Sequence, residues 1–61
     1  MGLLEQIEAY LERTRVAPST FGRLVAGDPR LVADLRAGRR LRDATRSRIM
    51  HYLRENRRRN P

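Results

Sequence analysis

Apolar residues recur at intervals of three and four near both ends of the chain, a spacing that predicts amphipathic helices. We expect one helix over residues 3–14 and another over residues 43–55, with Asp43 as the N-cap of the second. The apolar stripe of the first helix is formed by Leu3, Leu4, Ile7, Tyr10 and Leu11. The apolar positions of the second are Ala44, Ile49, Met50, Tyr52 and Leu53. Each stripe can close one side of a common core.

Between these helices, residues 18–40 predict two short helices joined by a tight corner. We place them at residues 18–25 and 29–37. Pro18 suits the first helical position, because its φ is already helical and its missing N–H needs no partner there. Gly27 can adopt the left-handed conformation that ends a helix.

The second short helix restarts directly after the corner. We expect Asp28 as its N-cap, Pro29 at its first helical position and Gly38 just past its end. Small residues at positions 22 and 26 allow the two helices to cross closely. The apolar side chains expected to face inward are Phe21, Leu24, Val32 and Leu35.

These elements predict an all-α fold, a compact bundle of four short helices in one domain over residues 1–56. Residues 57–61 offer no apolar side chain to pack, so we expect a basic, disordered tail. A chain of 61 residues buries only about 60% of its unfolded surface and is marginally stable alone. Because cysteine is absent, disulfides are excluded, and we expect helix packing and a homodimer to supply the stability.

Charge changes this picture most. The chain has fourteen basic residues, all arginine, against seven acidic ones, for a net charge of +7. Residues 1–12 carry −3 and residues 13–61 carry +10. A basic body of this kind attracts phosphate polyanions, and arginine offers paired hydrogen bonds to phosphate and guanine. The alternative is an arginine-rich surface that is merely solvated.

The spacing of the central segment resembles the helix-turn-helix of the phage-repressor type, as in lambda repressor, Cro and the Xre-like regulators. The positions that carry the resemblance are Phe21, Gly22, Ala26, Gly27, Val32, Leu35 and Gly38. One departure is the Ala26-Gly27 pair, where the family has glycine followed by an apolar residue. The resemblance covers about two thirds of the chain. It implies a lambda-repressor-like fold with the helix-turn-helix at its centre and a sequence-specific DNA-binding transcription regulator, either a repressor or an activator.

In that family, base edges are read by residues just after the turn and one helical turn further on. The corresponding residues are Pro29, Arg30, Ala33 and Asp34. Arg30 can read guanine through O6 and N7. Asp34 lies four residues later, so it can orient Arg30 or accept a hydrogen bond from cytosine N4. The alternative for the two is a plain surface ion pair.

The resemblance also implies contacts to the DNA backbone and between subunits. Phosphate contacts fix the register of a protein on DNA without reading sequence. The candidates are Ser19, Thr20, Arg23, Arg39, Arg40 and Arg42. For Ser19 and Thr20 the alternative is ordinary capping. The last helix dimerises some members of the family, and the candidate dimer contacts are Met50, Tyr52 and Leu53.

The residues do not support catalysis. There is no cysteine, one histidine (His51) and no phosphate-binding glycine loop, so we expect a non-enzyme without metal or cofactor. No apolar run approaches the ~20 residues that span a bilayer. The acidic N-terminus does not fit a signal peptide. We therefore expect no membrane association and a cytoplasmic location, at the nucleoid of a bacterial or phage-type system.

Two other functions stay open. One is a protein-interaction module that keeps the helix-turn-helix shape, as an antitoxin or regulator partner does, and binds through its first or last helix. The other is a non-specific nucleic-acid binder. Against the latter stand Asp28 and Asp34, since acids near the reading helix weaken phosphate attraction, and the low count of aromatic residues for stacking.

Overall fold

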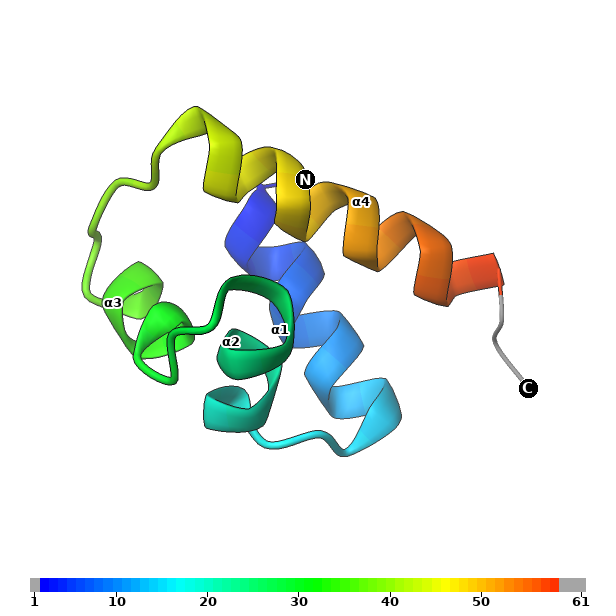
Figure 1. Ribbon diagram of the computed structural model, residues 1–61. Helices are drawn as coiled ribbons and strands as arrows, with labels where there is room; N and C mark the ends of the chain where they lie inside the picture. The colour runs from blue at the N-terminus through cyan, green and yellow to red at the C-terminus, as the bar shows by residue number, and fades with distance from the viewer. Residues whose placement is uncertain (1, 59–61) are drawn as a thin grey trace.

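The computed structural model describes residues 2–58, without the side chains of residues 57 and 58, and this part of the chain forms four helices and no strand. In chain order they are α1 (Leu3–Thr14), α2 (Pro18–Ala26), α3 (Leu31–Arg36) and α4 (Asp43–Arg58). α2 packs against α3 and α4, and α1 packs against α4 and α3 (Figure 1). The radius of gyration is 10.7 Å, close to the roughly 10.5 Å of a compact chain of this length. The predicted compact, all-α fold is confirmed.

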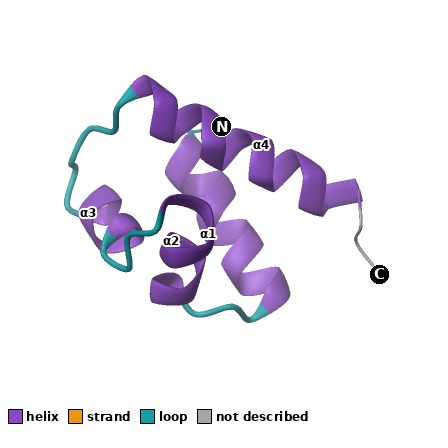
Figure 2. Cartoon of the chain, in the orientation of Figure 1, coloured by secondary structure: helices purple, strands orange, loops and turns teal. Residues whose placement is uncertain are grey.

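The ends of α1 and α2 follow the sequence signals. At the start of α1, the Gly2 N–H donates to the Glu5 carboxylate at 2.7 Å, so the third helical residue caps the helix. Pro18 occupies the first position of α2, as predicted. Gly27, with φ of 66°, ends α2 in the left-handed conformation, as also predicted. A longer irregular loop leads from α3 to α4 (Figure 2).

The predicted start of α3 at Pro29 is wrong, because α3 begins at Leu31 and runs for six residues. The side chain of Asp28 accepts the N–H of Arg30 at 2.9 Å, and its carbonyl accepts the N–H of Leu31 at 3.2 Å. These bonds hold residues 28–30 as a turn. Asp28 thus stabilises the corner and does not cap the helix.

α4 also differs from its prediction at both ends. Asp43 is its first helical residue rather than its N-cap, since the Arg42 carbonyl accepts the first bond, from the Arg46 N–H at 2.9 Å. The helix continues to Arg58 rather than ending at residue 55. The prediction of a disordered tail falls on residues 57–61, which lie outside the described residues except for the helical backbone of 57 and 58.

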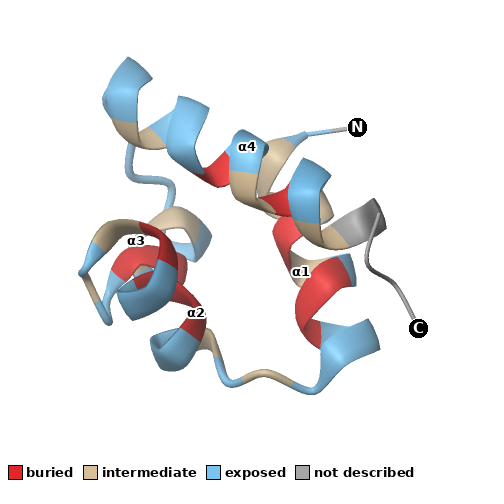
Figure 3. Ribbon diagram, turned by 45° about the vertical axis from the view of Figure 1, so that its right-hand side comes forward, coloured by how far each residue is buried: buried red, intermediate tan, exposed pale blue. Residues whose placement is uncertain are grey.

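The core draws apolar residues from all four helices, and Figure 3 shows buried positions on each of them. Its buried members are Ile7, Tyr10, Leu11, Phe21, Val25, Leu31, Val32, Ile49 and Leu53. Phe21 is fully buried, and its ring centre lies 5.5 Å from that of Tyr10 and 5.7 Å from that of Tyr52. Tilted and edge-on ring contacts of this kind add to the free energy of burial. One aromatic cluster therefore joins α1, α2 and α4.

α2 and α3 meet at a backbone contact that only glycine permits. A Cβ atom at Gly22 would lie 2.1 Å from the carbonyl oxygen of Asp28 and 3.1 Å from the Cβ of Leu31. The expectation that a small residue lets these helices approach is confirmed at this position. The contact fixes the angle between α2 and the corner that precedes α3.

The prediction that Leu24 faces inward is wrong, because its side chain is 61% exposed. The buried face of α2 consists of Phe21, Gly22 and Val25. Gly22 must face the corner, so α2 is rotated with Gly22 on its buried side. This rotation places Leu24 on the opposite, exposed side of the helix. Val32 is buried as predicted, and the half-buried Leu35 packs against the core.

Candidate nucleic-acid interface

The exposed surfaces of α2, the corner and α3 carry most of the predicted contact residues. Residues 18–42 hold six arginines and two aspartates, a net charge of +4. The exposed candidates in the helices and the corner are Ser19, Thr20, Arg23, Pro29, Arg30 and Ala33. Because Gly22 locks α2 against the corner, these side chains stand on a rigid frame. We call this surface the α2–α3 face.

Arg30 stands where α3 begins, as its N-cap residue with φ of −94° and ψ of 0°. Its backbone is held on both sides, since its N–H donates to the Asp28 side chain and its carbonyl accepts the Asp34 N–H at 2.8 Å. Among the described residues no carboxylate forms an ion pair with its guanidinium. A fixed backbone with an exposed guanidinium can present paired donors to a planar acceptor pair.

The Asp34 carboxylate pairs with Arg39, so the pairing with Arg30 that the sequence left open as one of several roles for Asp34 is not formed in this structure. The Arg39 guanidinium donates to the Asp34 carboxylate at 3.0 Å, and the Arg39 N–H donates to the Asp34 carbonyl at 2.9 Å. Gly38, with φ of 92°, turns the chain back so that Arg39 lies over the end of α3. The half-buried Asp34 carboxylate therefore neutralises a loop arginine.

The loop from α3 to α4 gathers the remaining predicted phosphate contacts. Arg39, Arg40 and Arg42 are all exposed. They border a hollow of about 300 Å³ that also reaches Asp28 and Asp34. Within the described part of the chain, no hydrogen bond or ion pair joins these arginines to the α2 candidates. The phosphate candidates thus form two groups, one on α2 and one on the loop.

An ion pair that the sequence patterns do not indicate ties α3 to α1. The Arg36 guanidinium donates two hydrogen bonds to the Glu8 carboxylate, each at 2.7 Å. The hydrogen bond from Arg36 lowers the pKa of Glu8, and the bond to Glu8 raises the pKa of Arg36. The partners are 28 residues apart, so helical spacing gives no sign of the pair. Arg36 is thereby turned toward α1.

The three candidate dimer residues on α4 lie in different environments. Leu53 is buried in the core, and Tyr52 is half-buried against Tyr10 and Phe21. Met50 is 44% exposed. Of the three, Met50 alone keeps a large exposed side chain, so a dimer seam built on this set has Met50 as its main contact. His51 is exposed, as expected.

Comparisons with protein-family models, curated proteins and solved structures found no match. Within residues 2–58, none of the helices is long and apolar enough to cross a membrane. In the same residues, no group of three or more His, Asp or Glu side chains lies close enough to hold a metal ion.

Proposed function

We propose that this protein is a sequence-specific regulator of transcription that binds double-stranded DNA through α2 and α3 as a helix-turn-helix. The observation that carries the proposal is the α2–α3 face, where Arg23 on α2 and Arg30 just before α3 are exposed on elements held by the Gly22 contact. Helices of this motif read bases with residues near the N-terminus of the second helix. Arg30 lies at that end of α3.

Each group of side chains has its own role in this proposal. Arg30 donates to a guanine, while Pro29 and Ala33 offer apolar contact to a thymine methyl group. Ser19, Thr20 and Arg23 bind phosphates at one side of α3, and Arg40 and Arg42 bind them at the other. Arg39 exchanges the Asp34 carboxylate for a phosphate when DNA arrives. That exchange frees Asp34 to accept from a cytosine amino group.

Two copies on one operator complete the proposal. A single α3 of six residues reads few base pairs, so specificity requires a second half-site. Two helices in successive major grooves lie about 34–36 Å apart. The protein acts by occupying the operator, which blocks polymerase or offers it a contact.

Single arginine variants test the proposal by DNA-binding titration at several salt concentrations. Arg30→Ala should cost about 1–3 kcal/mol on the preferred duplex and almost nothing on random duplex. Arg40→Ala should weaken binding to both duplexes alike and reduce the salt slope by about one. Arg54→Ala is the matched control, since it removes an exposed arginine from α4.

Two results contradict the proposal. Equal losses for Arg30→Ala on preferred and random duplex would leave only non-specific binding. A loss for Arg54→Ala as large as that for Arg30→Ala would show that total charge, and not the α2–α3 face, determines affinity.

A further inference from the structure

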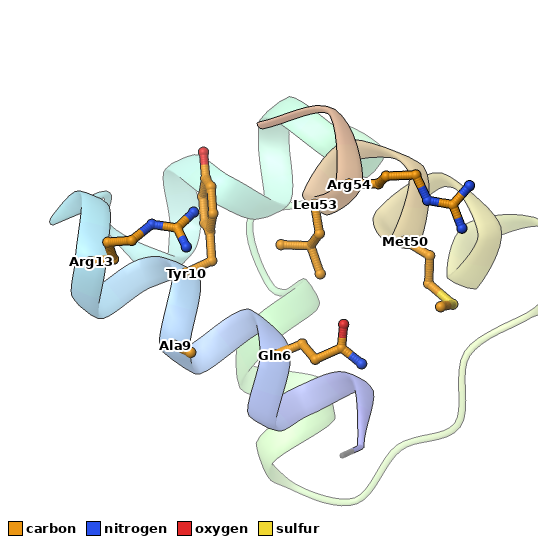
Figure 4. Close-up of a pocket in the computed structure, with 7 residues that line it drawn as sticks. All are labelled: Gln6, Ala9, Tyr10, Arg13, Met50, Leu53 and Arg54. Carbon is orange, nitrogen blue, oxygen red and sulfur yellow. The ribbon is translucent and has the colours of Figure 1, made fainter. Parts of the chain in front are cut away.

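A groove runs between α1 and α4, and α2, α3 and the loop between α3 and α4 contribute nothing to its lining. It encloses about 270 Å³. Tyr10 rises from α1, Met50 and Leu53 descend from α4, and Figure 4 draws all of the lining side chains. They are Gln6, Ala9, Tyr10, Arg13, Met50, Leu53 and Arg54. The groove is therefore a second surface, distinct from the α2–α3 face.

The inner part of the groove is apolar. Tyr10 and Leu53 form part of the core and are 7% and 8% exposed, so the small area that they show lies at the bottom of a packed interior. Met50 stands beside them and is 44% exposed. An unbranched thioether adapts to the shape of what it contacts, and exposed methionine is common on surfaces that bind partners. The groove can thus take an apolar side chain.

The rim of the groove is positive on both helices. Arg13 comes from the last turn of α1, with its guanidinium carbon 5.5 Å from the centre of the Tyr10 ring. Arg54 comes from α4 and is exposed. Among the residues that the structure describes, no carboxylate belongs to the lining. Two cations flanking an apolar floor complement an anionic partner that also brings an apolar group.

This charge pattern discriminates between occupants. Two copies that dock groove to groove about a two-fold axis meet through the same patch. The arginines of one copy would then face the arginines of the other, in a chain whose net charge is already +7. Like charges brought together across an interface oppose association, whereas opposite charges steer encounter. A second copy is therefore a poor occupant.

We propose that the α1–α4 groove docks a short acidic segment of a partner protein, with one apolar side chain between Tyr10, Met50 and Leu53. Carboxylates on either side of that anchor pair with Arg13 and Arg54. The segment binds on a surface that leaves the α2–α3 face open. The protein can thus hold DNA and an acidic partner together.

Selection of peptides from a displayed random library tests the proposal, with the full chain as bait. The retained peptides should carry net negative charge and a large apolar residue. Three variants then separate the groove from total charge. Arg54→Glu and Arg30→Glu each lower the net charge from +7 to +5, and Met50→Ala removes the exposed thioether without changing charge.

The expected result is a reciprocal pattern. Arg54→Glu and Met50→Ala should each weaken the selected peptide by roughly tenfold, with Arg30→Glu close to wild type. On a duplex with a single half-site, which needs no second copy, Arg30→Glu should weaken DNA binding while Met50→Ala leaves it intact, so failure of the DNA proposal shows itself separately.

Several outcomes overturn the docking proposal. One is a set of selected peptides without net negative charge. Another is equal weakening by Arg30→Glu and Arg54→Glu, which indicates attraction by total charge. A third is a concentration-dependent dimer in sedimentation that Met50→Ala abolishes, which indicates a second copy in the groove.

Discussion

The α2–α3 face and the α1–α4 groove both present exposed arginines, but they are built in different ways. On the α2–α3 face, a backbone contact between Gly22 and Asp28 sets the geometry, and the exposed candidates for DNA contact are polar or small. In the groove, side chains alone set the geometry, with Met50 over an apolar floor. A rigid polar face suits a ligand of fixed shape such as duplex DNA. An adaptable apolar floor with a charged rim suits a segment that moulds to it.

We expect the largest loss of stability from a substitution in the core that supports both surfaces. Phe21 is fully buried between the rings of Tyr10 and Tyr52. Phe21→Ala should cost about 3–5 kcal/mol, against the roughly 3–9 kcal/mol that a domain of this length has in total. Denaturant unfolding should show a variant that has lost roughly a third or more of its stability, or that is already unfolded without denaturant. Leu24→Ala, on the exposed side of α2, is the control and should change stability by less than about 0.5 kcal/mol. Equal losses would contradict the observed orientation of α2.

A smaller effect should test the backbone contact that makes the α2–α3 face rigid. Gly22→Ala places a methyl group 2.1 Å from the Asp28 carbonyl oxygen, so the corner must move. We expect a cost of about 3 kcal/mol, at the upper end of overpacking. The added methyl group of Gly27→Ala meets no atom within 4 Å, so the only penalty is the left-handed φ of 66° that alanine must adopt. That conformation costs roughly 1–2 kcal/mol. DNA affinity should fall further for Gly22→Ala, and a smaller unfolding effect than for Gly27→Ala would refute the close contact.

High pH should test the floor of the groove. Burial, together with the hydrogen bond to Tyr52, raises the pKa of Tyr10 from 10.0 to about 12. Folding therefore favours the protonated phenol, and the stabilisation is complete below pH 10.0 and lost as the pH rises toward about 12. Stability measured across that window should fall less steeply in Tyr10→Phe. An unchanged slope would show that the Tyr10 phenol is not desolvated.

Low pH should have the smallest effect, through the ion pair that joins α1 to α3. The bonds from Arg36 lower the pKa of Glu8 below 4.5. The ionised carboxylate is thus favoured by folding, so its stabilisation is present above pH 4.5 and is lost as the pH falls below it. Thermal unfolding of Glu8→Gln should depend less on pH in that acidic range than wild type. Glu12→Gln, on the same helix, is the control. A variant with the wild-type dependence would show that the pair does not survive in solution.

The helices differ in how well the sequence alone predicts where they begin and end. The bounds of α1 follow from local signals, namely its apolar stripe and the capping by Glu5. The start of α3 does not, because Asp28 followed by Pro29 fits both a helix cap and a turn. In the structure the turn forms, and its Asp28 carbonyl packs against Gly22 of α2. That contact exists only in the folded chain, so the local sequence does not indicate it.

The candidate sites show the same limit. The exposure of Arg30 and of the loop arginines agrees with the expectation from the sequence. The ion-pair partners of Asp34 and Arg36 could not be predicted from the sequence. The turn at Gly38 brings Arg39 back to Asp34, and the packing of α1 against α3 brings Glu8 to Arg36. The groove joins residues near the two ends of the chain, and neither helix alone indicates it. Local patterns predict the exposure of these arginines, whereas long-range packing decides their contacts and also turns Leu24 out of the core.

Selection from a random DNA pool, with the full chain at about 150 mM salt, tests most directly whether the α2–α3 face reads sequence. We predict that sequencing recovers a motif of paired half-sites. We also predict that selection with Arg30→Ala recovers the same motif with one position per half-site relaxed. Retained DNA without a motif, or a motif that Arg30→Ala leaves unchanged, would contradict sequence reading by the α2–α3 face.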